Sequence, residues 1–437
     1  MASTTNTSVG AWLGPERRPL TVLLGTGFLS LISNQLTSLA VPWFVLVLTG
    51  SATKMGITAA ATMLPSVVMM FLGGAIADRT NERRLSAFAD VLSGVTVALV
   101  PLLFALDYLT FEWLLVLMVA GAIFDTPGYS ARAKLLPKLA ERGGIEIERV
   151  TSLQGIFQAV SMIFGAILAG VLIASLGATN VLWINAAAFA ISAMTMMTLI
   201  PEMHVPREEV PSVVEDIKIG FRYVSGHAML RPLVLSALVI NGLLTPFAAV
   251  LLPYLANTEW QSATRYGLLI SGFGAGALIG SIAAGMLTEK MSRSTIFRLS
   301  LALLSLPVFV FVTIPNLPIA WIAAVSFGIG SGLINPLIMA LFYRITHPDL
   351  IGRANGLISA GAMIASPLGV LLIAPFLENY GLGWSFLVIG LTMTLFSAWI
   401  MFASPLLREI DKVETSLANG DGEGPPLVDP VETNLTP

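Results

Sequence analysis

Two carboxylates lie inside apolar segments of this chain, and they are the side chains best suited to carry chemistry. Asp90 lies about one turn inside the segment 86–107, and Asp125 lies deeper, inside the segment 112–135. A carboxylate at mid-bilayer costs about 2.5–3.5 kcal/mol on insertion scales, so one that persists there should face a protein interior. Such a group is suited to binding a proton or another cation. We therefore predict that Asp125 binds a proton or another cation. This makes it a candidate for coupling the movement of that cation to another process.

Nearby cations offer each carboxylate a simpler role. Arg132 follows Asp125 by seven residues, which places both on the same helix face two turns apart and allows a local ion pair. Asp90 follows a basic loop that contains Arg83 and Arg84, and it could pair with that loop. The sequence leaves both alternatives open, and Arg132 is therefore a candidate together with Asp125.

Neutral amides within the apolar segments form a second set of candidates. They could orient a substrate by hydrogen bonds, or they could bridge neighbouring helices, which is a common role of amides in membranes. The candidates for a substrate pathway are Asn34, Gln35, Gln158, Asn241 and Asn335. Aromatic side chains such as Phe247 and Phe327 could stack on an apolar cargo, but core packing is the commoner role of such residues.

Other chemistries are disfavoured by what the sequence contains. There is no cysteine, and the three histidines lie in polar connections, so we expect no metal site. Glycine clusters at 272–280 and 328–332 lie inside apolar segments without a strand-to-helix context, which predicts close helix packing and no nucleotide cofactor. A membrane-embedded enzyme would need a catalytic cluster that this sequence lacks. We therefore expect a protein that is not an enzyme. We also expect that it binds no nucleic acid, because its cations are dispersed.

The elements that position these residues follow from composition. The chain has 437 residues, of which 55% are hydrophobic and 11% charged. An ordinary soluble protein has about 25% charged residues, so the bilayer must be the main solvent here. At about 20 residues for each crossing, we predict twelve apolar spans, at 20–48, 55–77, 86–107, 112–135, 152–176, 179–200, 232–254, 266–288, 294–314, 317–342, 353–377 and 382–404.

The chain also repeats itself. Landmarks recur at a constant offset of 211 residues: Pro42 and Pro253, Gly56 and Gly267, Gly74 and Gly285, Asp78 and Glu289, and Pro137 and Pro348. Six predicted spans fall in each copy. Two similar halves in an apolar chain are typical of secondary transporters, whose site lies between repeats near the bilayer midplane. The predicted fold class is an all-α membrane protein with twelve transmembrane helices in two six-helix pseudo-repeat bundles.

Polar stretches divide the chain into five parts. We predict a cytoplasmic segment at 1–18, bundles at 19–200 and 232–406, a cytoplasmic linker at 201–231 and a disordered cytoplasmic tail at 407–437. The linker is expected to hold an amphipathic helix on the membrane surface, with a short solvated helix as the alternative. With both termini inside, all but two of the 23 Lys and Arg residues are cytoplasmic. This indicates a multi-pass protein of the cytoplasmic membrane.

A charged loop joins the second and third spans and recurs in the second copy. The first copy contains Gly74-Ala-Ile-Ala-Asp78-Arg79-Thr-Asn81-Glu82-Arg83-Arg84, and the second contains Gly285-Met-Leu-Thr-Glu289-Lys290-Met-Ser-Arg293. Both resemble the signature loop of the major facilitator superfamily. We expect a cytoplasmic gate, with charges that could meet the start of the eleventh span. The gating candidates are Gly74, Asp78, Arg79, Arg83, Arg84, Gly285, Glu289, Lys290 and Arg353. The alternative is that these charges only fix the topology.

A finer resemblance extends over most of 19–406. It rests on Leu39-Ala-Val-Pro42-Trp43, Phe124-Asp125-Thr-Pro127, Leu135-Leu-Pro137 and Pro348-Asp349-Leu-Ile-Gly352-Arg353. These motifs resemble the bacterial branch of macrolide efflux pumps and siderophore exporters. The resemblance implies the major facilitator fold, alternating access, and export of hydrophobic or amphipathic small molecules driven by proton entry.

Alternatives with the same fold remain open. The first span carries Ser33-Asn34-Gln35 where relatives often carry an acid. Amides at that place would suit an uncoupled facilitator or a lipid or lysolipid flippase. A sensor or scaffold with an inactive transport core is a further alternative. The resemblance implies a monomer in contact with membrane lipids, with a small-molecule substrate and protons as partners.

Overall fold

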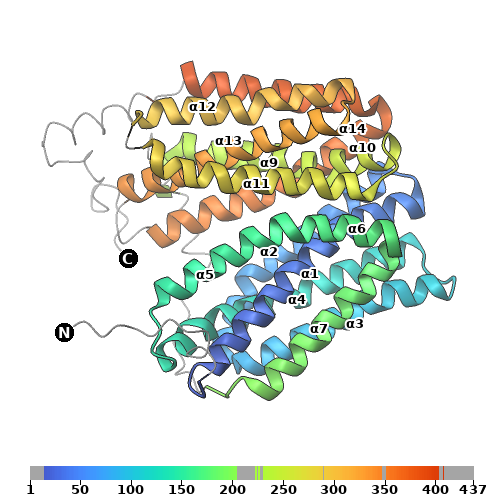
Figure 1. The fold of residues 1–437 in the computed structure, drawn as a ribbon, viewed down its shortest axis with the longest axis vertical. Helices are drawn as coiled ribbons and strands as arrows, with labels where there is room; N and C mark the ends of the chain where they lie inside the picture. The colour runs from blue at the N-terminus through green and yellow to red at the C-terminus, as the bar shows by residue number, and fades with distance from the viewer. Residues whose placement is uncertain are drawn as a thin grey trace, which may run out of the picture. The chain divides into compact units, whose positions relative to one another are not determined.

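The structure is a computed structural model. It describes residues 14–203, 222–223, 225–226, 230–288, 290–346, 351–402 and 407, and it leaves the side chains of 70–79, 344–345, 352–353 and 357 undescribed. Most of the predicted amphipathic linker helix and of the predicted tail lies outside these residues. The described part of the chain is helical, as Figure 1 shows, and contains no strand.

The helices of the first half begin with α1 and end with α7. Their bounds are α1 Arg18–Thr49, α2 Ala52–Arg79, α3 Glu82–Ala105, α4 Phe111–Arg142, α5 Ile147–Val160, η2 Ser161–Gly165, α6 Ala166–Leu176 and α7 Ala178–Leu199. The short π-helical turn η2 joins α5 to α6, so these three segments form one continuous rod.

The helices of the second half begin with α9 and end with α14. Their bounds are α9 Leu230–Pro246, η3 Phe247–Leu251, α10 Leu252–Thr258, α11 Ala263–Leu287, α12 Arg293–Ser305, η4 Leu306–Thr313, α13 Leu317–Ile345 and α14 Ile351–Phe402. Gly381 interrupts α14 with a φ of 82°, a backbone conformation that glycine adopts without steric cost. This kink divides α14 into two helices.

The helices match the predicted spans. Ten helical segments among the described residues are long and apolar enough to cross a membrane. Dividing the last of them at Gly381 and adding α2 brings the number to the predicted twelve. Most of the observed elements are longer than the predicted apolar runs, because polar turns extend several helices beyond their apolar parts.

The internal repeat extends to the helix caps. Helices α2 and α11 begin at Ala52 and Ala263, and α3 and α12 begin at Glu82 and Arg293, so both pairs differ by 211 residues. The residues before these starts cap them. Side-chain oxygens of Ser51, Ser262, Asn81 and Ser292 each accept a hydrogen bond from the backbone N–H three residues on.

Packing divides the chain into two compact units. Unit 1 comprises residues 1–44 and 61–210, and unit 2 comprises residues 45–60 and 211–437. Residues 45–60 belong to unit 2 because they pack on α14. Glu378 of α14 accepts hydrogen bonds from Ser51 Oγ at 2.8 Å and Thr53 N at 2.7 Å. A Cβ atom at Gly56 would collide with that of Ala374, which shows how closely α2 approaches α14 there.

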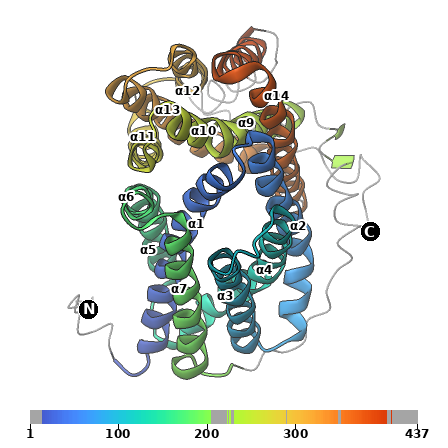
Figure 2. The same cartoon turned by 90° about the vertical axis from the view of Figure 1, so that its right-hand side faces the viewer.

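Different pairs of helices make the main packing contacts inside each unit. In unit 1, α3 packs against both α4 and α7, which stand beside it in Figure 2. An apolar cluster around Leu20, Leu135, Leu139 and Val150 fills one part of its core. In unit 2, α11 packs along α13 and α9 packs along α14.

Candidate functional site

Unit 1 contains a cavity of about 190 Å³ among α1, α4, α5 and α7. Its wall is partly apolar and partly polar. The polar and aromatic side chains that line it are Phe28, Ser30, Ser33, Asn34, Asp125, Tyr129, Arg132, Gln154, Phe157, Gln158, Asn185 and Phe189. The predicted coupling candidates Asp125 and Arg132 and two of the predicted amides, Asn34 and Gln158, therefore meet at one place.

Asp125 contributes a carboxylate to this cavity from the middle of α4. Its side chain is half-buried, and the part of the chain that the structure describes gives it no hydrogen bond and no ion pair. Arg132, two turns further along α4, also lines the cavity. A carboxylate held in a cavity without a direct partner can accept a proton or meet a cationic group of a ligand.

Three residues hold the guanidinium of Arg132. Its Nε donates to Ser86 Oγ at 2.9 Å, its Nη1 donates to Ser30 Oγ at 3.1 Å, and its Nη2 binds Asp90 Oδ1. Its ion pair is therefore with Asp90, not with Asp125. The expected local pair within α4 does not form, because α3 presents a buried carboxylate to the same arginine.

The pairing of Asp90 with the basic loop before α3 is not observed either. Asp90 forms an ion pair, but with Arg132 of α4 and not with the basic loop that precedes α3. The reason is that Asp90 is 1% exposed and lies on the face of α3 that packs against α4 and α7. Arg83 and Arg84 of the loop contact residues at and just after the end of α7 instead.

Aromatic rings and amides complete the cavity. The rings of Phe28 and Phe157 lie 4.8 Å apart and tilted, and they provide a broad apolar surface across α1 and α5. Asn34 and Gln158 are exposed at the cavity, where their amides are available to a ligand. Asn185, in contrast, donates to Thr37 Oγ1 and so bridges α7 to α1.

The other predicted amides lie elsewhere. Gln35 packs against Gly165 of η2 and does not line the cavity. In unit 2, Asn241 and Asn335 donate to carbonyl oxygens of their own helices, Ala237 O at 2.8 Å and Ser331 O at 3.0 Å. Within unit 1, Gln35 therefore does not join Asp125 in the cavity, and Asn241 and Asn335 belong to unit 2.

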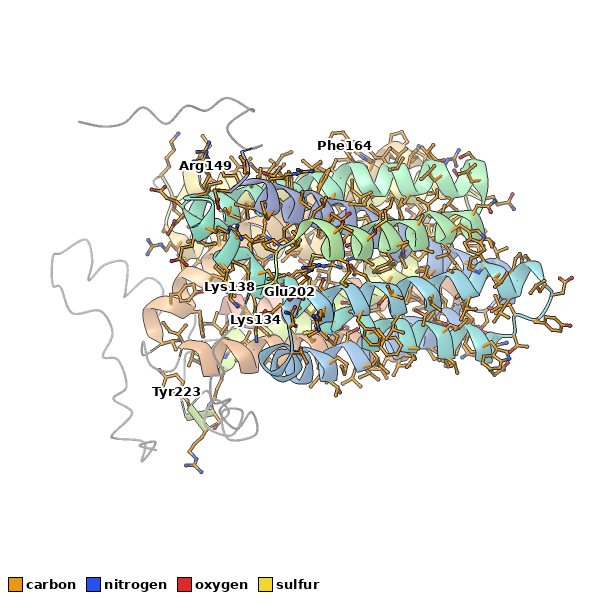
Figure 3. All side chains as sticks on the ribbon, turned by 90° about the horizontal axis from the view of Figure 1, so that it is seen from below. Lys134, Lys138, Arg149, Phe164, Glu202 and Tyr223 are labelled. Carbon is orange, nitrogen blue, oxygen red and sulfur yellow. The ribbon has the colours of Figure 1, made fainter. Side chains whose placement is uncertain are left out.

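The first signature loop is tied to unit 1 by several contacts. Arg84 forms an ion pair with Glu202 at 3.0 Å, and Arg83 donates to the carbonyl oxygen of Met197 near the end of α7. Buried Glu82 pairs with Lys138 of α4 at 2.7 Å. Lys138 and Glu202, labelled in Figure 3, thus both contact the first turn of α3.

The remaining gating candidates are described only in part. The side chains of Gly74, Asp78, Arg79 and Arg353 and the whole of Glu289 lie outside the described residues. Lys290 is exposed. A Cβ atom at Gly285 would meet no atom within 4 Å, so close packing does not explain the glycine there.

Several residues of the site were not predicted from the sequence. They are Ser30, Ser86, Phe28 and Phe157. Asp90 was recognised as a carboxylate inside a span, but its pairing with Arg132 was not predicted. A usable signal existed for Asp90, because two carboxylates and one arginine occur inside two successive spans. Nothing in the spacing indicated whether Arg132 would form its ion pair with Asp90 or with Asp125.

Comparison with known proteins agrees with this architecture. The profile of the Major Facilitator Superfamily matches residues 23–255 and, in a second match, 234–429. The chain is 31% identical to the multidrug efflux pump Tap of Mycolicibacterium fortuitum, over 91% of this chain and 98% of that protein. It is 27% identical to the enterobactin exporter EntS of Salmonella typhimurium, over 84% of this chain and 89% of that protein.

Solved structures share the fold. The nucleoside transporter NupG, as its D323A mutant, superposes with a TM-score of 0.75 at 12% identity and covers 88% of this chain and 99% of its own. A bacterial homologue of the iron transporter ferroportin in an inward-facing state superposes with a TM-score of 0.66 at 16% identity, over 87% and 99% of the two chains. With two matches to the family profile, this fold and a relative of 31% identity, the chain belongs to the major facilitator superfamily, as a multi-pass membrane transporter and not an enzyme.

Proposed function

We propose that this protein exports hydrophobic or amphipathic small molecules across the cytoplasmic membrane by alternating access, and that proton entry at Asp125 drives the export. The observation that carries the proposal is the cavity of unit 1. It combines a carboxylate that has no direct partner with an aromatic wall formed by Phe28 and Phe157. An apolar pocket with a few polar groups is typical of sites for small organic ligands.

The comparisons support the direction and the cargo class. Two relatives that match over most of this chain carry names that describe a multidrug efflux pump and a siderophore exporter. The sequence contains no phosphate-binding loop for ATP, so the energy for export would come from an ion gradient. A proton that binds Asp125 and a cargo that displaces it would couple the two movements.

Inverted membrane vesicles that are acidified inside would test the proposal. Addition of a cargo should release protons from the vesicle interior, and a panel of lipophilic cations, macrolides and siderophores would cover the proposed class. Asp125→Asn should abolish this release. The matched control is Asp107→Asn, the same substitution at an exposed residue after α3, which should leave proton release unchanged.

A specific result would contradict proton coupling. If cargo crosses the membrane in an uptake assay while the internal pH stays constant, the protein is an uncoupled facilitator or a lipid or lysolipid flippase. Loss of transport in Asp107→Asn to the same degree as in Asp125→Asn would show that the effect is not specific to the cavity.

We further propose that the two signature loops form a cytoplasmic gate. The residues assigned to it are Gly74, Asp78, Arg79, Arg83, Arg84, Gly285, Glu289, Lys290 and Arg353. Charged residues at equivalent places of the same sequence pattern in both repeats support this proposal. Asp78→Asn and Arg83→Ala should each slow transport at normal membrane abundance, and unchanged transport in both would exclude the gate. The orientation with both termini in the cytoplasm and the monomeric state belong to the same proposal.

A further inference from the structure

We propose that Asp90 is a positioning residue that holds Arg132 away from Asp125 and so leaves Asp125 as the one unpaired charge of the cavity. This inference rests on the proposed role of Asp125 in coupling and assigns a role to a residue outside the cavity lining. Asp90 would act through Arg132 and would touch neither cargo nor the transferred proton.

The contacts of Arg132 show how it is held. Its three guanidinium nitrogens contact three different residues, on α1 through Ser30 and on α3 through Ser86 and Asp90. A guanidinium presents its donors in a rigid planar fork, so hydrogen bonds from all three nitrogens fix its orientation. Asp125 receives none of these hydrogen bonds.

Burial makes the pair with Asp90 hard to break. The side chain of Asp90 is 2% exposed and that of Arg132 is 14% exposed. The second carboxylate oxygen of Asp90, Oδ2, is buried without a hydrogen-bond partner, so Arg132 supplies the compensation for this charge. Breaking a buried pair leaves an uncompensated charge, which is strongly unfavourable. Arg132 therefore forms a more stable ion pair with Asp90 than it would form with half-buried Asp125.

Release of Arg132 would change the cavity. Arg132 lies in the cavity wall two turns from Asp125 on α4. Asp125 and Arg132 are the charged residues among those that line the cavity. Without Asp90, the arginine would have Asp125 as its alternative carboxylate. The cavity would then lose the group that accepts a proton or a cationic cargo.

Carbodiimide labelling of the full-length protein would test this arrangement directly. Dicyclohexylcarbodiimide modifies carboxyl groups in apolar surroundings and reacts poorly with a carboxylate in an ion pair. We expect Asp125 to be labelled in the unmodified protein, as quantified by mass spectrometry. Asp90→Asn preserves the shape of the side chain but removes its charge. It should lower the labelling of Asp125 about tenfold, within the range of coupling between contacting residues.

The double variant distinguishes positioning from a general structural role. Asp90→Asn combined with Arg132→Gln removes both members of the pair, so no arginine remains to occupy Asp125. Labelling of Asp125 should then return to within about threefold of the original value. If the double variant is labelled as poorly as Asp90→Asn alone, Asp90 does not act through Arg132 and the inference is overturned.

A second variant keeps the test open if Asp90→Asn fails to fold. Ser30→Ala combined with Ser86→Ala removes the two other contacts of Arg132 and should lower the labelling in the same direction by a smaller factor. Labelling that falls by less than about threefold would agree with Asp90 as the main holder of Arg132, whereas a loss of about tenfold would show that the serines position the arginine and would overturn the inference. Because labelling needs neither cargo nor a gradient, a failed transport assay would refute the proposed function and leave this result to decide the role of Asp90.

Discussion

The interiors of the two units are filled by different kinds of residue. Unit 1 contains Glu82 and Asp90, which are the buried charged residues among those that the structure describes, and it contains the cavity with Asp125. In unit 2, Phe247 contacts the rings of Phe311, Phe327 and Phe386 at centroid distances of 5.2–5.9 Å. Unit 2 therefore has an aromatic core where unit 1 has polar groups.

Glycines in unit 2 allow two helices to pack with their backbones in contact. A Cβ atom at Gly276, Gly280, Gly328 or Gly332 would collide with backbone atoms of the facing helix, because α11 and α13 pack with their backbones in contact. Small residues allow such close packing in membranes, where the hydrophobic effect does not drive helices together. The two copies of the repeat thus share element positions and caps, while the cavity with Asp125 and the buried charges of the described residues lie in the first copy. Four changes test this comparison.

The largest effect is expected at the interface of α11 and α13. Gly276→Leu would drive a side chain into the carbonyl of Val325, so we expect a loss of stability beyond the about 1–3 kcal/mol that is typical of overpacking. The yield of monodisperse protein and its thermal unfolding in detergent would measure it. The matched control is Gly155→Leu in α5, where a Cβ meets nothing within 4 Å. Equal stability of both variants would refute the backbone contact.

The aromatic core of unit 2 is expected to give the next largest effect. Phe247 is 3% exposed, so Phe247→Ala should lower the free energy of unfolding by about 3–5 kcal/mol. Phe157→Ala, at the half-buried cavity wall of unit 1, should cost less stability and weaken cargo binding instead. Thermal unfolding and a binding titration would separate the two. A reversed order of stabilities would show that the cavity wall, not the aromatic cluster, holds the fold.

The ion pair between Lys138 and buried Glu82 in unit 1 should contribute less to the free energy of unfolding. Lys138→Met leaves the carboxylate of Glu82 buried without its partner, at a cost of about 2 kcal/mol, because Lys138 itself is 30% exposed and solvent weakens the pair. Denaturation of Lys138→Arg provides the control, since it keeps the charge. A variant with methionine that is as stable as the original would mean that water reaches Glu82.

The smallest effect is expected at the exposed pair of the signature loop. Arg84 and Glu202 have side chains that are 70% and 49% exposed, so Arg84→Ala should change the free energy of unfolding by less than about 1 kcal/mol. Unfolding at low and high salt would check this value. A large loss of transport with unchanged stability would support the gate, whereas a large loss of stability would make Arg84 a structural residue.

The sequence determined the fold through signals that are local or periodic. Apolar runs of membrane-spanning length predicted the helices, and the 211-residue offset predicted that both copies form the same supersecondary unit. The starts of α2 and α11, and of α3 and α12, agree with this prediction. The predicted role of the glycine clusters in helix packing is confirmed by α11 and α13. These features depend on residues close in the chain or on composition, and a bilayer leaves few alternatives to helices.

The pairing of charges across helices was decided by the tertiary structure. Asp90, Asp125 and Arg132 were all visible as charged residues inside spans, but their spacing favoured partners on the same helix or the adjacent loop. Which face of α3 meets α4 depends on the packing of the whole unit, and that packing places Asp90 against Arg132. The sequence by itself thus determined which charges enter the membrane. Only the structure decided which of them neutralise each other, because an ion pair depends on distances between helices that the sequence does not encode locally.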